Sequence, residues 1–376
     1  MNIILVTGIL LIIISVLCRK TYNPYLGFAF VFLIMGFQSN VEGDFMTYAN
    51  SFDMIGHSNV FDARNLKTEP VFPNLMRFFT FGPFWFFILC LSLFQTYVLT
   101  TFVRNYGNNK YHYIAPILFF FSFPMMLMQM KALRQGLAVE FVLLAIVFID
   151  KAKNFIPPLI CSLLAYYSHN SSMVVLPFVA LYYLINRKPE ILNKDILVVK
   201  GKNIFPLFMV SIFLLVYIIK LKILNQYLGA IAMLSDNRLA SYADSSATGR
   251  ESIDANIFDI SPLIVLYDAL MVFLVAWFMK RTNPKMRVFC IVTIVSCIFD
   301  MLFFGLGTLA RMIMYLMVFS LVVYPSVALE IKKQYGPLWV TLFIVLLVGY
   351  AVKTSLPWML GTDDGRFGTY QFVFLE

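Results

Sequence analysis

Charged residues are scarce in this chain of 376 residues: Asp, Glu, Lys and Arg make up 13% of it, and hydrophobic residues make up 60%. The sequence has no P-loop, no Gly-rich nucleotide fingerprint, no HExxH pair and no cluster of His and Cys. We therefore expect no metal site and no cofactor. The five cysteines all lie in hydrophobic stretches, where they predict small apolar packing residues and no disulfide.

A soluble fold could not bury this much apolar surface. The mean hydropathy is +0.80, which is typical of an integral membrane protein. A membrane-spanning helix needs about 20 mostly apolar residues, and the sequence predicts an all-α polytopic protein with one transmembrane domain over residues 1–376. Twelve candidate transmembrane helices cover residues 2–18, 24–40, 82–103, 112–128, 133–149, 155–169, 172–186, 204–220, 262–279, 288–305, 309–328 and 337–353.

Basic residues gather in alternate connections between these spans, which marks those connections as cytoplasmic. Few acidic residues share them, and both termini are then predicted to face outward. The net charge of +9 therefore reflects membrane topology, and we expect no nucleic-acid partner. The basic residues in question are Arg19, Lys20, Arg104, Lys110, Lys151, Lys153, Arg187, Lys188, Lys194, Lys200, Lys202, Lys280, Arg281, Lys285, Arg287, Lys332 and Lys333.

Two predicted outward loops, residues 41–81 and 221–261, are long enough to carry function. Leucine and isoleucine recur at three- and four-residue steps from Leu221 to Leu234, which predicts a helix lying on the outer membrane surface. A loop helix packed on the bundle is an equal alternative.

Ionisable residues within the hydrophobic stretches all fall toward the outer side of this topology. A charge at the bilayer centre costs about 2.5–3.5 kcal/mol, so such groups must face protein or water. Their one-sided distribution indicates a polar chamber that opens outward. The residues are Arg134, Glu140, His169, Asp268, Asp300 and Arg311.

Arg134 and Arg311 are predicted to begin helices that run inward, where backbone N–H groups and the helix dipole favour anions. Together they could bind a phosphate or diphosphate; alternatively, Arg134 pairs with Glu140 and Arg311 with Asp300. His169 lies in a predicted tight outward hairpin, where it could donate a hydrogen bond to phosphate or shuttle a proton. A structural role for this histidine is equally favoured.

The first outward loop places carboxylates beside aromatic rings, a combination common in sugar-binding sites. Asp44 precedes Phe45 and Tyr48, and Glu69 begins a Glu-Pro-Val-Phe motif. Asp44, with Glu69 as second choice, is the candidate for acceptor binding or base catalysis, and Tyr48 is a candidate for sugar binding. An Asp-Gly turn with interfacial aromatics is the structural alternative.

Five motifs follow one another along the chain, at residues 43–48, 69–72, 131–138, 169–172 with Leu176-Pro177, and 311–315. Taken in this order, they resemble the EpsG-type family of membrane polymerases, which are Wzy-like polymerases of surface polysaccharide and O-antigen. One position departs from the family, which often carries an Arg just before the Gly-Asp pair, where Gln38-Ser39-Asn40 stands here. The resemblance therefore does not extend to a phosphate contact by that arginine in the first loop.

The resemblance implies a GT-C-like, metal-independent glycosyltransferase in the bacterial inner membrane, with its active face periplasmic or extracellular. The implied substrates are oligosaccharides linked to undecaprenyl diphosphate, and a chain-length regulator is an implied partner beside membrane lipids. Arg134, Arg311 and His169 would bind the donor diphosphate. Asp44, Glu69 and His169 would serve acceptor binding or catalysis.

Two other functions remain as alternatives. An O-antigen ligase would use the same outward chamber and transfer glycan to a lipid A core. A lipid-linked oligosaccharide flippase would need polar groups along the full depth of the membrane, and the outward crowding of ionisable residues argues against it.

Overall fold

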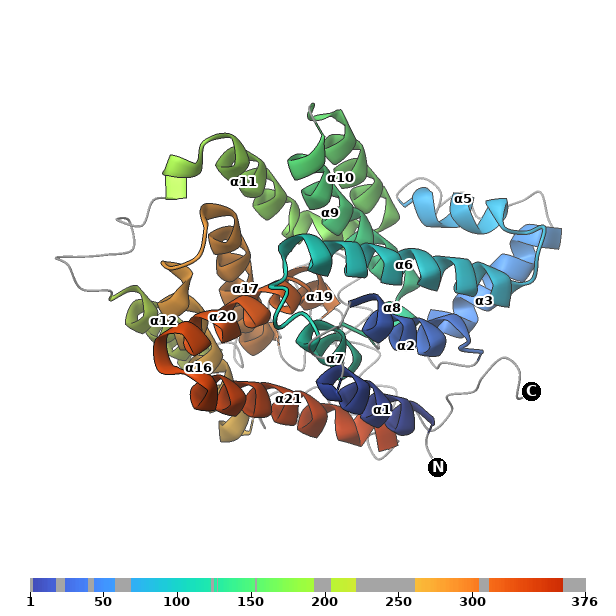
Figure 1. The fold of residues 1–376 in the computed structure, drawn as a ribbon. Coiled ribbons are helices and arrows are strands. Elements are labelled where there is room, and N and C mark those ends of the chain that lie inside the picture. The colour runs from blue at the N-terminus through green and yellow to red at the C-terminus, as the bar shows by residue number, and fades with distance from the viewer. Residues whose placement is uncertain are drawn as a thin grey trace. The chain divides into compact units, whose positions relative to one another are not determined.

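Helices and short 3-10 turns form the regular structure of the part of the chain that the computed structural model describes (Figure 1). The all-helical class is confirmed for those residues. The chain divides into two compact units, residues 1–191 with 318–376 and residues 192–317. The described residues are 3–17, 24–39, 44–57, 69–122, 125–126, 128–152, 154–192, 204–220, 261–303 and 311–360.

The first unit holds most of the helices. Helix α7 packs against α1, α2, α20 and α21, and α2 lies along α6. The elements of this unit are α1 (Ile3–Leu17), α2 (Pro24–Gly36), α3 (Asp44–His57), α5 (Val71–Phe78), α6 (Phe84–Tyr106), α7 (Ile114–Phe120), α8 (Met128–Lys131), α9 (Leu133–Lys151), α10 (Ile156–Ser168), η2 (Asn170–Val174), α11 (Leu176–Arg187), α20 (Ser320–Tyr335) and α21 (Pro337–Leu360), and η3 (Pro189–Leu192) ends at the boundary.

In the second unit, three longer helices pack on one another: α12 (Phe205–Ile219), α16 (Pro262–Met279) and α17 (Pro284–Phe303). The short turn η6 (Arg311–Ile313) and helix α19 (Met314–Met317) follow, and α19 packs on α17.

Several of the described helices are apolar enough to cross a membrane. Four have sufficient length, over Phe84–Tyr106, Pro262–Met279, Met314–Tyr335 and Pro337–Leu356. Shorter apolar helices cover Leu5–Leu17, Pro24–Gly36, Ile156–Ser168 and Phe205–Ile219. The protein is thus a multi-pass membrane protein, while the count of twelve spans and the outward termini stay predictions.

One predicted span, residues 112–128, is not a single helix. Helix α7 ends at Phe120, and the next α-helix, α8, begins at Met128. Pro124 stands between them in the sequence, and proline lacks a backbone N–H and disfavours helical geometry in the residue before it. The helix predicted between Leu221 and Leu234 lies outside the described residues.

Helix α9 is largely buried within the first unit, and a stripe through Phe141, Leu144 and Phe148 is partly exposed. It packs most extensively on α10, which lies beside it (Figure 1), and also on α6, α8 and α11. A helix that is apolar all round belongs in a core, and α9 is so from Leu137 to Ile149 apart from Glu140. The backbone of α9 is therefore a fixed support for the polar residues at its two ends.

Candidate functional site

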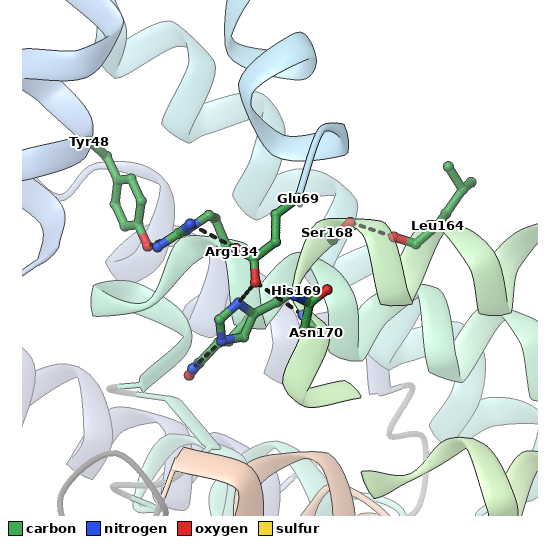
Figure 2. A network of polar contacts seen from close by, with 8 residues as sticks. Tyr48, Glu69, Arg134, Leu164, Ser168, His169 and Asn170 are labelled. Atoms are coloured by element: carbon green, nitrogen blue, oxygen red, sulfur yellow. Dashed lines mark hydrogen bonds and ion pairs between the residues drawn. The ribbon is translucent and has the colours of Figure 1, made fainter. Parts of the chain in front are cut away.

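Four residues that the sequence singles out come together in the first unit, each from a different segment. Tyr48 lies on α3, Glu69 directly precedes α5, Arg134 is in the first turn of α9, and His169 connects α10 to η2. Figure 2 shows these side chains pointing toward one another, with Glu69 at the centre. We call Tyr48, Glu69, Arg134 and His169 the Glu69 cluster.

Both carboxylate oxygens of Glu69 accept hydrogen bonds. Oε2 lies 2.8 Å from Nη1 of Arg134, and Oε1 lies 2.7 Å from Nδ1 of His169. The backbone N–H of Asn170 also donates to Oε1, at 3.1 Å. The Glu69 side chain is only 11% exposed, so its orientation is set by protein donors on each oxygen.

Burial and neighbouring charges have opposite effects on the pKa of the Glu69 carboxyl. Burial by itself would raise its pKa, but the hydrogen bond and charge of His169, the N–H of Asn170 and the charge of Arg134 together lower that pKa below its usual value. Glu69 is therefore an ionised acceptor at neutral pH, with a low tendency to take up a proton.

Arg134 is the most exposed of the three ionisable groups in the cluster, with 32% of its side chain accessible. Its Nε donates to the Tyr48 hydroxyl at 3.2 Å, and its guanidinium carbon lies 5.7 Å from the centre of the Tyr48 ring. This distance is typical of a cation–π contact. The cation is thus held by a carboxylate and an aromatic ring, and it stays within reach of an incoming anion.

His169 has a partner on each ring nitrogen. Nδ1 faces Glu69, and Nε2 lies 2.8 Å from Nε2 of Gln135. Sequence reasoning did not assign a role to Gln135, although the residue stands beside Arg134 in the motif 131–138. The signal in the sequence is the position of this glutamine, between Arg134 and the apolar run that begins at Leu137; in the structure its side chain is buried.

The sequence around His169 and Glu69 explains how the two are presented. Helix α10 ends at Ser168, His169 adopts an extended backbone with φ −161° and ψ 123°, and the Ser168 hydroxyl bonds back to the Leu164 carbonyl at 2.7 Å. A single residue therefore connects α10 to η2, and the outward hairpin stays a prediction. Glu69 precedes Pro70, and a residue before proline favours an extended backbone that carries it away from the following helix.

The arginine pairing offered as an alternative is wrong in one case: Arg134 pairs with Glu69, whereas Glu140 is fully buried near Gln129. Asp44 begins α3 and Arg311 begins η6, and both side chains lie outside the described residues. Their assigned roles stay predictions.

Two further predicted acids, Asp268 and Asp300, lie on α16 and α17 of the second unit. They interact electrostatically with each other, and Lys220 at the end of α12 supplies opposite charge near Asp300. In the described part of the chain, no group of three His, Cys, Asp or Glu side chains has the arrangement of a metal site.

The comparison with protein families decides the assignment, because the family model for the EpsG family matches residues 4–358. The chain belongs to the EpsG family. Every residue of the Glu69 cluster lies within the matched region of this EpsG-family protein. No curated protein and no solved structure matches the chain. Membership supports a membrane polysaccharide polymerase role for this EpsG-family protein.

Proposed function

We propose that this EpsG-family protein polymerises lipid-linked oligosaccharide repeat units at the outer face of the bacterial inner membrane. The growing glycan is transferred from undecaprenyl diphosphate to a terminal hydroxyl of the next repeat unit, in O-antigen or a related surface polysaccharide. The observation that carries the proposal is the Glu69 cluster, which combines an accessible arginine with a carboxylate-bound histidine in a membrane protein of this family.

Arg134 is proposed to bind the donor diphosphate. A guanidinium matches the geometry of phosphate oxygens, and its charge offsets the negative charge that grows on the leaving diphosphate as the C1–O bond breaks. Arg311 is the proposed second cation. A preorganised donor of this kind contributes about 2.7–4 kcal/mol to the transition state.

His169 is proposed to accept the proton of the acceptor hydroxyl. The hydroxyl oxygen bonds to C1 of the donor glycan, the C1–O bond to phosphate breaks with its electron pair going to the diphosphate, and the hydroxyl proton passes to Nε2 of His169. Glu69 bonds to Nδ1 and orients the ring, as the carboxylate does in a catalytic triad. Because both oxygens of Glu69 already accept hydrogen bonds, orientation suits this residue better than base catalysis.

The remaining assignments complete the proposal. Asp44 is the candidate for acceptor binding or an alternative base. The Tyr48 ring is buried against Arg134 and Phe72, which suits it to holding the arginine better than to the predicted stacking against a sugar. The reaction so described needs no metal and no cofactor, because arginine side chains supply the positive charge. A chain-length regulator is the proposed protein partner. A single displacement inverts the anomeric centre, so a polymer that retains the donor configuration would contradict this mechanism.

The test is glycan length in cells that lack the gene, complemented with wild type, Arg134→Ala or Lys333→Ala. Lys333 is an exposed residue on α20 and serves as the control. With equal membrane levels of all three proteins, Arg134→Ala should lose the long glycan ladder while single repeat units still reach the surface, and Lys333→Ala should keep the ladder. Loss of all surface glycan would indicate a ligase or a flippase instead.

A further inference from the structure

Gln135 occupies the position beside Nε2 of His169 that the proposed reaction requires for the acceptor hydroxyl. Its amide nitrogen lies 2.8 Å from Nε2, and Nδ1 on the other side of the ring is bonded to Glu69 at 2.7 Å. A hydroxyl can therefore reach Nε2 only when the Gln135 amide gives up its place.

The Gln135 amide also selects the protonation state of the ring. An amide N–H can only donate, so Nε2 is an acceptor and the imidazole is neutral with its proton on Nδ1, directed to Glu69. The amide oxygen, Oε1, is buried and has no hydrogen-bond partner among the described residues. Rotation of the amide by half a turn would bring this oxygen to Nε2, where it could accept a hydrogen bond from Nε2 once that nitrogen carries a proton.

We propose that Gln135 is the positioning residue for His169. In the resting site, its amide N–H donates to Nε2 and keeps that nitrogen unprotonated. When the acceptor binds, the amide moves away and the acceptor hydroxyl takes its place at Nε2. After proton transfer, the amide oxygen accepts a hydrogen bond from the new N–H until the proton leaves to solvent. The inference rests on the proposed function for the identity of the hydroxyl. The preference for one ring tautomer does not depend on that function.

Two charged groups of the Glu69 cluster lie near the ring. Glu69 contacts Nδ1 directly, Arg134 acts on the ring through Glu69, and the Asn170 N–H binds the same Glu69 oxygen as the ring does. The charges of the Glu69 carboxylate and the Arg134 guanidinium sum to zero. An additional carboxylate at residue 135 would therefore change the preferred state of the ring.

The first test is nitrogen NMR of the full chain in detergent micelles with 15N-labelled histidine. The chain contains three histidines, so His169→Asn identifies the resonance of interest. We expect the Nδ1–H tautomer for the wild type, loss of the hydrogen bond at Nε2 in Gln135→Met, and a doubly protonated ring at neutral pH in Gln135→Glu. An Nε2–H tautomer in the wild type, or an unchanged spectrum in Gln135→Met, would overturn the inference.

The second test is the pH dependence of polymer formation in membrane vesicles that carry the cell's own lipid-linked repeat units. Gln135→Met should lower the rate about 10-fold, and Gln135→Glu should move the acid limb of the profile upward by at least about one pH unit, because a second carboxylate favours the imidazolium. Gln129→Met, a glutamine on α8 that is just 1% exposed, is the matched control and should keep the wild-type profile.

The two tests separate this inference from the proposed function. Failure of wild-type vesicles to form polymer from supplied repeat units would overturn the function, and the catalytic part of the inference with it. Normal polymer formation with an unchanged profile in both Gln135 variants would overturn the inference alone. Agreement between the ring spectrum and the shifted profile would support both.

Discussion

Helix α9 has a polar cluster at each end, and the two clusters differ in charge and in accessibility. At its first turn, Arg134 and His169 bind Glu69, with 32% and 20% of the arginine and histidine side chains exposed. At its last turn, Oδ2 of Asp150 accepts hydrogen bonds from the hydroxyls of Tyr106 and Tyr182, at 2.7 and 2.8 Å. The first cluster can attract an anion, whereas the second presents a carboxylate that accepts hydrogen bonds from two tyrosine hydroxyls.

The spacing of the two clusters fits opposite faces of a membrane. Helix α9 has 19 residues, and at 1.5 Å per residue its ends lie about 28 Å apart, close to the thickness of a hydrocarbon core. Lys151 follows Asp150 on the predicted cytoplasmic side. The same helix therefore supports the Glu69 cluster at one end and a clamp between α6, α9 and α11 at the other.

The largest expected effect is from Arg134. Arg134→Ala removes the cation proposed to stabilise the leaving diphosphate, and the initial rate of ladder formation in membrane vesicles should fall about 100- to 1000-fold. Arg134→Lys should recover only part of the rate, because an ammonium lacks the planar fork of donors. Asp150→Asn, at the other end, should stay within about 2-fold of wild type. An equal loss in both variants would show that the ends of α9 are not functionally different.

Glu69→Gln should have the next largest effect, about 10- to 100-fold on the same rate. The substitution keeps the shape but removes the negative charge and replaces one of the two acceptor oxygens by an NH2 donor, so Arg134 and His169 can no longer both donate to their own oxygen, and hydrogen bonds to charged groups contribute about 1.5–3 kcal/mol each. Asp150→Asn is again the isosteric comparison, and its rate should stay near wild type.

The thermal stability of the wild type and of Glu69→Gln should depend differently on pH. The pKa of Glu69 is lowered in the folded protein, so its ionised form stabilises the fold above the ordinary glutamate pKa, and that contribution is lost as pH falls through the lowered value. The thermal midpoint of the wild type in detergent should therefore drop as the pH is lowered from about 5 to about 3. Glu69→Gln should have a lower midpoint at neutral pH and a shallower drop, and a parallel decline in both proteins would argue against this carboxylate as the source.

The sequence indicates the residues of the Glu69 cluster individually but not their partners. Arg134 and His169 interrupt apolar stretches, which marks them as polar groups that must face protein or water, and Tyr48 and Glu69 belong to motifs that place carboxylates beside aromatic rings in the first outward loop. Their partners come from helices far apart in the chain, and no local pattern encodes those contacts. Glu69 and Arg134, for example, are 65 positions apart.

Helix geometry explains why one predicted pairing is wrong. Arg134 and Glu140 are six positions apart on α9, and neighbours on a helix face are three or four positions apart. Six positions place the two side chains on different faces and about 9 Å apart along the axis. The same limit explains why Gln135 and the Asp150 clamp were missed, since each takes its meaning from a residue on another helix.

A smaller effect, on stability alone, is expected at the far end of α9. Tyr182 is fully buried and its hydroxyl donates to Asp150. Tyr182→Phe should cost about 1–3 kcal/mol of stability, because the carboxylate loses a buried donor. The measurement is the thermal midpoint of the purified protein, which should fall, together with the vesicle rate at a temperature where the variant stays folded, which should not change. A rate loss at full protein level would place this end in the mechanism.

The smallest effect is expected from the matching substitution at the first end, Tyr48→Phe. The hydroxyl accepts a long hydrogen bond of 3.2 Å from Arg134, while the ring that contacts the guanidinium remains in phenylalanine. We expect a 2- to 5-fold lower rate, equivalent to about 0.5–1 kcal/mol for one hydrogen bond, and a thermal midpoint close to wild type. The two Tyr→Phe variants remove the same atom from opposite ends of one helix. If each lowers a different quantity, rate at Tyr48 and stability at Tyr182, then accessibility and charge distinguish the ends; if both lower stability alone, the Glu69 cluster is a structural clamp as well.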